Sequence, residues 1–342
     1  MNHVAIDLHD EYSQICVMTE AREVVTEAKV RTTRAALADF FGNRERSRVV
    51  FEAGPHALWV GELLTELGHE PLACHPRRIR LIAESRNKND RVDAQLLARL
   101  SLSDLELIKP IQRRSRKTIE QRSVIRSRSA LVDTQKRLRT MLRGIVKPFG
   151  VQVAGGKKRA LSELAQVELP ALARVSVDAV LRTLEMVAAQ IRELDKHIEQ
   201  LTTDHPVAAR LQTIPGVGPL VSMTFIHAIE DPSRFRPTEV GPFLGLTPSN
   251  RSSAGKKLSS SDRARPGDPY VRSLLVQAAW TLMNSRSESD LANWGRGLLE
   301  RIGAKKAAVA VARKLAVLMH HLWLEDEPFS PRPKHQRELA TT

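Results

Sequence analysis

The chain has 342 residues, of which 42% are hydrophobic and 4% aromatic, and its 53 basic and 39 acidic residues give a net charge of +14. This length predicts two or three domains, and the few aromatic side chains argue against nucleic-acid binding dominated by base stacking. Two cysteines, Cys16 and Cys74, support neither a disulfide framework nor a zinc site. The N-terminus has no signal-peptide pattern, and we expect no apolar run long enough to span a membrane. We therefore expect a cytoplasmic protein.

The N-terminal part, residues 1–108, shows the pattern of an α/β domain. Three short strands are predicted first, then a helix, a strand, a helix and a fifth strand, over residues 3–9, 12–19, 23–32, 33–42, 48–52, 57–67 and 70–74. Three strands followed by alternating helix and strand indicate an α/β layer with a mixed sheet. This order fits a ribonuclease-H-like fold, in which acidic residues gather at strand ends and on a nearby helix.

Four acidic residues stand where such a fold would gather them. Asp7 and Glu52 each end an apolar run, and Asp90 and Asp93 lie three residues apart at the start of a helical stretch, which places both on one helix face. Four carboxylates can hold two Mg²⁺ ions, because this cation prefers oxygen ligands. Two such ions can clamp the attacking and leaving oxygens of a phosphodiester. Singly, each acid could instead be a turn or surface residue, or an N-cap.

Residues 109–206 are predicted to form a basic helical arm. From Lys109 to Arg159 the chain has sixteen Lys or Arg residues and two acids, which accounts for its whole excess of positive charge. Such a segment indicates a surface for phosphate backbones, whereas a merely solvated helix face usually mixes signs. The candidate contacts here are Arg113, Arg114, Arg116, Lys117, Arg122, Arg126, Lys136 and Arg137, joined farther along the chain by Lys256 and Lys257.

The second half of this arm has a regular apolar repeat. Its apolar positions alternate in steps of three and four residues, at Val177, Val180, Leu184, Val187, Ile191, Leu194, Ile198 and Leu201. This spacing is typical of a coiled-coil seam. A hairpin of two helices within the chain would satisfy it, and so would pairing with another subunit. We favour a coiled coil that contributes to oligomerisation.

Residues 207–328 are predicted to be a mainly helical C-terminal domain, and residues 329–342 a flexible tail. The segment 213–218, Thr-Ile-Pro-Gly-Val-Gly, is similar to the turn of helix-hairpin-helix modules, whose backbone N–H groups face a DNA phosphate. A plain packing turn between helices is the alternative.

The segment 249–257, Ser-Asn-Arg-Ser-Ser-Ala-Gly-Lys-Lys, is either a surface loop or a nucleophilic serine beside cations. Spacing alone does not separate these interpretations.

Together these motifs resemble one family, the DEDD-type transposases of bacterial insertion sequences, which are relatives of the Piv DNA invertases. The resemblance extends over residues 3–325. Its N-terminal motifs are Ala-Ile-Asp7, Phe-Glu52-Ala-Gly and Asn-Asp90-Arg-Val-Asp93-Ala, which match the four acids that name the family. Its C-terminal motifs are residues 213–218, Phe-Leu-Gly-Leu-Thr-Pro at 243–248, and Ser-Ser-Ala-Gly-Lys at 252–256.

The resemblance implies an α/β plus α architecture with a RuvC-like N-terminal domain and Mg²⁺ bound by Asp7, Glu52, Asp90 and Asp93. It implies a serine nucleophile that becomes joined to a DNA phosphate, which falls at Ser253, with Ser252 as the fallback. The implied partners are double-stranded DNA of the element ends and target, further copies of the chain in a dimer or tetramer, and a structured guide RNA held by shape and backbone. The implied location is the bacterial cytoplasm, at the nucleoid.

Two departures from the family pattern affect this interpretation. The usual Ser-Gly is Ser253-Ala254-Gly255 here, and Arg265-Pro266-Gly267 stands where members often have Lys-Arg-Gly or Lys-Ala-Gly. Two other functions are considered beside recombination. In a RuvC-like resolvase the carboxylates alone would direct hydrolysis by water, and in a non-catalytic protein the acids would have no chemical role.

Overall fold

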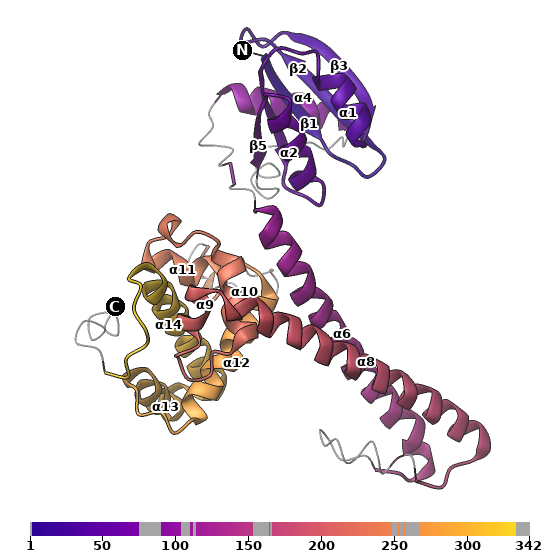
Figure 1. The fold of residues 1–342 in the computed structure, drawn as a ribbon, viewed down its shortest axis with the longest axis vertical. Helices are drawn as coiled ribbons and strands as arrows, with labels where there is room; N and C mark the ends of the chain where they lie inside the picture. Colours follow the sequence, from indigo (N-terminus) through magenta and orange to yellow (C-terminus); the bar gives the residue numbers. More distant parts are fainter. Residues whose placement is uncertain are drawn as a thin grey trace. The chain divides into compact units, whose positions relative to one another are not determined.

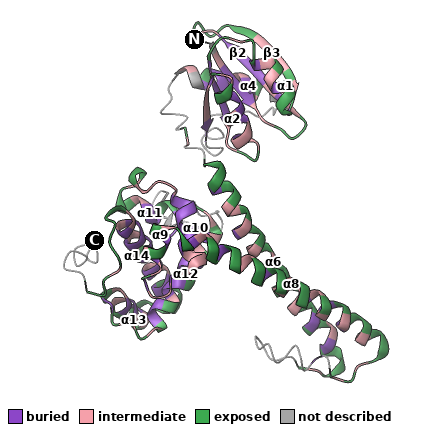
Figure 2. Ribbon diagram, in the orientation of Figure 1, coloured by how far each residue is buried: buried purple, intermediate pink, exposed green. Residues whose placement is uncertain are grey.

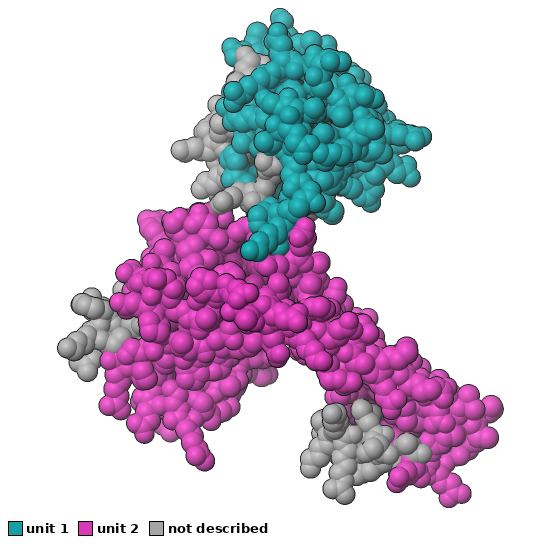
Figure 3. All heavy atoms as spheres, viewed as in Figure 1, with its two compact units in different colours: residues 1–117 teal, residues 118–342 magenta. Residues whose placement is uncertain are grey.

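A computed structural model describes residues 2–74, 90–103, 110–111, 114–152, 164, 166–247, 252–253, 256–257 and 267–332. The chain divides into two compact units, residues 1–117 and 118–342 (Figures 1 and 3). Each unit has its own buried core (Figure 2), and each is described separately below.

The first unit is built on a five-stranded mixed sheet. Its strands are β1 (Asn2–Asp7), β2 (Tyr12–Met18), β3 (Val24–Arg31), β4 (Ser47–Glu52) and β5 (Glu70–Cys74), in the order β3-β2-β1-β4-β5. β1 and β3 are antiparallel to β2, whereas β4 is parallel to both β1 and β5. The expected α/β domain with a mixed sheet is therefore confirmed.

Helices cover both faces of this sheet. α1 (Arg34–Phe41) and α2 (Ala57–Glu66) cover one face, where Ile6 and Phe51 are fully buried. α4 (Asp90–Ser103) covers the other, where Ala5 and Val50 pack with Ala94, Leu97 and Ala98. Because both faces of β1 and β4 are buried, these two strands are nearly continuous apolar runs rather than alternating ones.

The second unit begins with two long helices that pair with each other. α6 (Arg116–Val146) starts at the boundary between the units, a 3₁₀ turn (Lys147–Phe149) follows it, and α8 (Ala171–Thr203) lies beside it in Figure 1. Buried Leu142 and Val146 of α6 pack with Val177, Val180 and Leu184 of α8. Nearer the N-terminal end of α6, its residue Arg128 is ion-paired with Asp195 of α8. The predicted seam is thus buried in a hairpin within the chain, and its contribution to oligomerisation stays a prediction.

The rest of the second unit is mainly helical, as expected. Its elements are α9 (Pro206–Leu211), α10 (Pro219–Ile229), a 3₁₀ turn (Pro232–Arg234), α11 (Pro237–Phe243), β6 (Ser252–Ser253), β7 (Lys256–Lys257), α12 (Pro269–Asn284), α13 (Asp290–Ile302) and α14 (Ala304–Leu324). Beyond α14, Phe329 N donates a hydrogen bond to Thr213 Oγ1 (2.9 Å), and Pro331 O accepts one from Asp290 N (3.1 Å). The start of the predicted tail, residues 329–332, therefore lies against the helices, and residues 333–342 are outside the described part.

One expectation about apolar runs is wrong. α14 has 21 residues and contains an 18-residue stretch that is long and apolar enough, by length and composition, to cross a membrane. However, 56% of that apolar stretch is buried inside the protein, where Val311, Leu315 and Met319 belong to the core of the second unit. A helix that is apolar nearly all round is expected at the centre of a helical domain. We therefore interpret α14 as a core helix.

Candidate active site and nucleic-acid interface

The register of the sheet brings two of the four predicted acids together. In the parallel pair of β1 and β4, Ile6 is the partner of Phe51, so Asp7 and Glu52, one residue farther on, end neighbouring strands at the same edge. Alternate residues of a strand face the same side of a sheet. Asp7 and Glu52 therefore lie on the face of the sheet that α4 covers.

The Asp7 carboxylate is only partly shielded from solvent. Its side chain is 20% exposed, and its Oδ2 atom lies 3.0 Å from Nε2 of His9, which is half-exposed. This histidine is a contact of the acid that the sequence pattern did not identify. The only signal in the sequence is that a histidine follows the strand-end acid by two residues, and this spacing is too common in turns to identify a contact.

The other two predicted acids lie at the start of α4. Asp90 is its first residue and partly buried Asp93 is in its first turn. This turn is fixed to the sheet by Glu27 of β3, which pairs with Arg91 and accepts a hydrogen bond from Gln95 (2.5 Å). The hydrogen bond from Arg91, followed by that from Gln95, holds the pKa of Glu27 below its ordinary value. Glu27 thus anchors the helix that carries Asp90 and Asp93.

The described residues only partly outline a metal site. The donor set consists of carboxylates alone, which suits a hard cation such as Mg²⁺. Among the side chains that the structure describes, no three His, Cys, Asp or Glu residues are close enough together to hold an ion. The side chain of Asp90 is outside that description. The structure therefore supports Asp7 and Glu52 as neighbours, and the complete four-acid centre stays a prediction.

The two candidate serines lie in a small antiparallel hairpin in the second unit. β6 pairs with β7 so that Ser253 is opposite Lys256 and Ser252 is opposite Lys257. The side chains of these four residues are outside the described part. At the level of the backbone, each candidate nucleophile has a basic residue as its cross-strand partner.

The segment with this hairpin starts and ends at one place in the fold. Gly267 has a φ of +87°, and a Cβ atom there would lie 2.5 Å from the carbonyl oxygen of Phe243 and 3.0 Å from the backbone nitrogen of Gly245. Only glycine fits such a conformation and such a close approach without strain. The Arg-Pro-Gly sequence, which departs from the family pattern, therefore keeps the glycine that the fold requires here.

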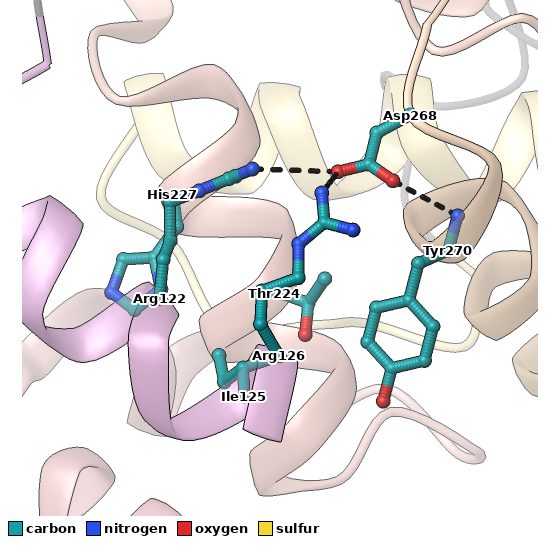
Figure 4. Close-up of a pocket in the computed structure, with 7 residues that line it drawn as sticks. All are labelled: Arg122, Ile125, Arg126, Thr224, His227, Asp268 and Tyr270. Carbon is teal, nitrogen blue, oxygen red and sulfur yellow. Dashed lines mark hydrogen bonds and ion pairs between the residues drawn. The ribbon is translucent and has the colours of Figure 1, made fainter. Parts of the chain in front are cut away.

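A small cavity lies where this segment joins α12 (Figure 4). It has a volume of about 10 Å³, close to the minimum for one water molecule. Asp268 is the acidic residue that lines it. Its Oδ2 atom is ion-paired with Arg122 (3.4 Å) and with Arg126, both of α6. The other oxygen, Oδ1, accepts a hydrogen bond from the backbone N–H of Tyr270 (2.9 Å) and so caps α12. The lining residues are Arg122, Ile125, Arg126, Thr224, His227, Asp268 and Tyr270.

The predicted phosphate contacts differ in exposure. In the second unit, Lys136 and Arg137 are exposed, and Lys136 pairs with Asp133 (2.9 Å). Arg126 has a half-exposed side chain, whereas that of Arg122 is only 18% exposed. In the first unit Arg114 and Lys117 are exposed, as is Arg116, which pairs with Glu62 (2.5 Å). Arg113 and the side chains of Lys256 and Lys257 are outside the described part.

The glycine-rich turn at 213–218 serves as a packing turn. It joins α9 to α10, with Ile214 and Val217 buried. Gly216 has a φ of +90°, and a Cβ atom there would lie 2.7 Å from the carbonyl oxygen of Ala278 in α12. The turn is thus pressed against another helix, as the plainer interpretation expected. A phosphate contact by the start of α10, which follows Gly218, stays a prediction.

Two family models match this chain, and together they cover both units. One, described as a transposase and named for the DEDD transposases of IS110, matches residues 4–149. The other, described as the transposase IS116/IS110/IS902 family, matches residues 208–293. The chain belongs to this family of insertion-sequence transposases. As a transposase, it is an enzyme that cleaves and rejoins DNA strands.

Several relatives are similar along most of this transposase. The transposase for insertion sequence element IS1111A of Coxiella burnetii is 26% identical and covers 95% of this chain and 90% of its own length. The transposase for element IS1328 of Yersinia enterocolitica is 26% identical, and the match covers 84% of this chain and 86% of that protein. The y4pF/y4sB protein of Sinorhizobium fredii, also named as a transposase, is 29% identical, and the match covers 87% of this chain and 78% of that protein.

Proposed function

We propose that this transposase recombines DNA through a serine nucleophile and a metal centre that act on the same phosphate. The observation that carries the proposal is the placement of Asp7 and Glu52 at the ends of neighbouring parallel strands, on the face of the sheet covered by α4. The sheet order, with three antiparallel strands followed by two parallel ones, is the order expected of a ribonuclease-H-like, RuvC-like domain. Asp90 and Asp93 at the start of α4 complete the proposed set of ligands.

Each part of the site has a distinct chemical task. When Mg²⁺ is bound by Asp7, Glu52, Asp90 and Asp93, it supplies charge to the scissile phosphate and lowers the pKa of an oxygen bound to it. The Ser253 hydroxyl attacks phosphorus and gives its proton to solvent. The bond from phosphorus to one DNA oxygen breaks as the phosphoserine bond forms, and the departing oxygen takes a proton from solvent. Attack by a DNA hydroxyl on this phosphoserine reverses the steps and rejoins a strand. The phosphoester bond is therefore conserved rather than lost to hydrolysis.

The exposed basic residues of α6 support a proposed nucleic-acid interface. Lys136 and Arg137 offer charge without base-specific geometry, which suits recognition of a phosphate backbone.

We include a structured guide RNA and assembly into a dimer or tetramer as parts of the proposal. They rest on the resemblance of the motifs, and on an arm that is both basic and long. RNA from the flank of the element should bind at least as tightly as unrelated RNA of equal length, and a lack of any such binding would remove the guide from the proposal.

The serine assignment is tested by trapping the protein–DNA adduct on denaturing gels. Ser253→Ala should abolish both the adduct and recombination, because alanine lacks the attacking oxygen. Ser252→Ala tests the fallback position. Ser273→Ala is a matched control, since Ser273 is an exposed serine on α12 in the same unit. Mg²⁺-dependent nicking without any adduct in the unmodified protein would instead indicate a hydrolytic resolvase.

A further inference from the structure

A row of polar side chains crosses the sheet of the first unit on the same face as the two strand-end acids. Asp7 of β1 is the register partner of Gln14 in β2, and Gln14 is the partner of Lys29 in β3. Glu52 of β4 lies on the other side of Asp7. Because register partners face the same side of a sheet, this row leads from the acids to a basic residue on the edge strand β3.

The edge of the sheet beside this row has an aromatic ring with two cations over it. Tyr12 and its register partner Arg31 stand two residues beyond Gln14 and Lys29, so they share the same face. The Lys29 Nζ atom lies 4.9 Å from the centre of the Tyr12 ring, and the Arg31 Cζ atom lies 5.8 Å from it. Both cations are exposed and the ring is half-buried, so the ring holds two flexible side chains beside solvent.

The position of α4 separates this basic group from the core. The preceding register pair on the same face is Cys16 with Glu27. Cys16 is buried with residues of α4, and Glu27 pairs with Arg91 in the first turn of that helix. The helix therefore covers the row before the acids. Lys29 and Arg31 lie toward the edge at which the strands of the two acids end.

We infer that Tyr12, Lys29 and Arg31 form a subsite for the backbone of the DNA strand that is cleaved. This inference rests on the proposed metal centre at Asp7 and Glu52, and it adds a place where that DNA strand is held. The two cations supply charge to a phosphate group, and the Tyr12 ring positions them. The Gln14 side chain, which lies between them and Asp7 in the row, has an amide group that can donate a hydrogen bond to a phosphate oxygen.

The distance across the sheet fits a phosphate close to the cleaved one. Neighbouring β-strands lie about 4.8 Å apart, so β3 is about 10 Å from β1. Each nucleotide advances a DNA strand by about 3.4 Å along the helix axis. The subsite therefore corresponds to a phosphate about three nucleotides from the one at the metal centre.

Edge protection is the other task that these cations could have. Charged side chains on an edge strand oppose pairing with a second sheet, and β3 is an edge strand (Figure 1). Protection requires charge on the strand but no particular face and no aromatic partner. Lys29 and Arg31 instead share the face of the acids and lie over one ring, which favours a phosphate contact.

The first measurement is binding of the full-length protein to a fluorescein-labelled duplex with the sequence of the element end, followed by anisotropy at several salt concentrations. The double variant Lys29→Gln/Arg31→Gln should raise the Kd about tenfold, and should lower the slope of log K against log salt by about one. Tyr12→Leu should raise the Kd about twofold to fivefold. Tyr12→Phe keeps the ring and should bind as the unmodified protein does.

A neutral methylphosphonate, placed at one DNA linkage at a time, locates the contact. The cleaved linkage is identified from the product ends that the unmodified protein forms. A neutral linkage about three nucleotides away should weaken binding by the unmodified protein. It should not weaken binding by Lys29→Gln/Arg31→Gln further, because both changes remove one shared contact. Arg46→Gln is the matched control, since Arg46 is exposed just before β4, at the opposite end of that strand from Glu52. It should keep the full sensitivity to the neutral linkage.

An unchanged Kd of the double variant would overturn the inference, and so would losses from the variant and the neutral linkage that multiply at every position. If the double variant self-associates in light scattering, Arg31→Gln takes its place, since that variant keeps one charge on β3. Self-association of the double variant, with no neutral linkage near the cleaved one affecting the unmodified protein, would assign the cations to edge protection.

The proposed metal centre fails separately, if Asp7→Asn still cleaves DNA. The coupling of Lys29 and Arg31 to one DNA linkage is measured as binding and not as cleavage. It therefore decides whether the subsite exists in either case.

Discussion

Asp7 and Glu52 end two neighbouring parallel strands, one residue beyond the register pair of Ile6 and Phe51. Residues 45 positions apart in the sequence are therefore adjacent at one edge of the sheet, and both carboxylates face the side that α4 covers. Two carboxylates in this arrangement present oxygen ligands to one region of space. This relationship underlies the first prediction.

Substitution of either strand-end acid should abolish metal-dependent cleavage. Asp7→Asn or Glu52→Gln should lower the cleavage rate by roughly a hundredfold or more, because loss of one preorganised contact to developing charge has an effect of this size. Cleavage of a labelled DNA substrate across a Mg²⁺ titration provides the measurement. Asp39→Asn changes an exposed residue of α1, on the opposite face of the sheet; it is the control and should behave as the unmodified protein. Full activity of Asp7→Asn would show that these acids do not hold the catalytic metal.

Glu27 should couple the stability of the first unit to acid pH. Its pKa is lowered by the hydrogen bond from Arg91, followed by that from Gln95. The stabilisation is therefore present above the ordinary pKa of 4.5 and is lost as the pH falls through the lower, folded-state pKa. Glu27→Gln should show a smaller loss of stability on acidification from pH 4.5, as followed by thermal melting.

The same variant should also affect catalysis, because Glu27 anchors the first turn of α4. A looser turn would place Asp90 and Asp93 less well, so a higher Mg²⁺ concentration should be needed for half-maximal cleavage. Glu23→Gln removes an exposed carboxylate near the same strand and is the control. An unchanged Mg²⁺ requirement in Glu27→Gln would argue against the anchor.

Gly216 and Gly297 should respond to alanine in opposite directions. Gly216→Ala places a Cβ atom 2.7 Å from the Ala278 carbonyl at a φ of +90°, and backbone strain of this kind costs about 1–3 kcal/mol. Gly297 lies within α13, where a Cβ atom would meet nothing within 4 Å, so Gly297→Ala should stabilise by about 0.5–1 kcal/mol. Urea unfolding measures both changes. Equal stability of the two variants would contradict the packing role of the turn.

The exposed basic residues of α6 should contribute to affinity in a salt-dependent way. Arg137→Gln should weaken binding to duplex DNA of any sequence, and should reduce the slope of log K against log salt by about one. Fluorescence anisotropy at several salt concentrations gives this slope. Arg296→Gln is a useful control, since Arg296 of α13 donates hydrogen bonds to the carbonyl of Met283 in α12 and to those of Ser285 and Ser287 in the connection that follows. A slope that is unchanged in Arg137→Gln would place the phosphate contacts elsewhere.

Much of the first unit could be predicted because its signals are local. The fifth strand, Glu70–Cys74, has the predicted bounds, and β2 and β3 differ from the predicted ranges only at their ends. These strands are rich in apolar or β-branched residues and are separated by turn residues, and both features depend on neighbours in the sequence. The helical repeat of α8 is local in the same sense, and it predicted the seam that buries Val177 and Ile198.

The rest depends on contacts between distant residues. The pairing of Asp268 with Arg126 joins positions 142 residues apart, and no local pattern marks it, because Asp268 by itself reads as an N-cap. The sequence analysis also missed that α14 contains an apolar run long enough to span a membrane, and composition alone fits a membrane helix and a core helix equally. The backbone pairing of Ser253 with Lys256 is likewise a contact that composition does not indicate.

The most direct test of the account is identification of the residue that becomes bonded to DNA. Adduct formed by the unmodified protein with duplex DNA and Mg²⁺ should be digested with nuclease and protease, and the remaining phosphopeptide sequenced by mass spectrometry. The account predicts a phosphoserine at Ser253, formed in the presence of Mg²⁺ and absent from Asp7→Asn. A phosphate attached to a different residue, or cleaved DNA with no attached peptide, would contradict it.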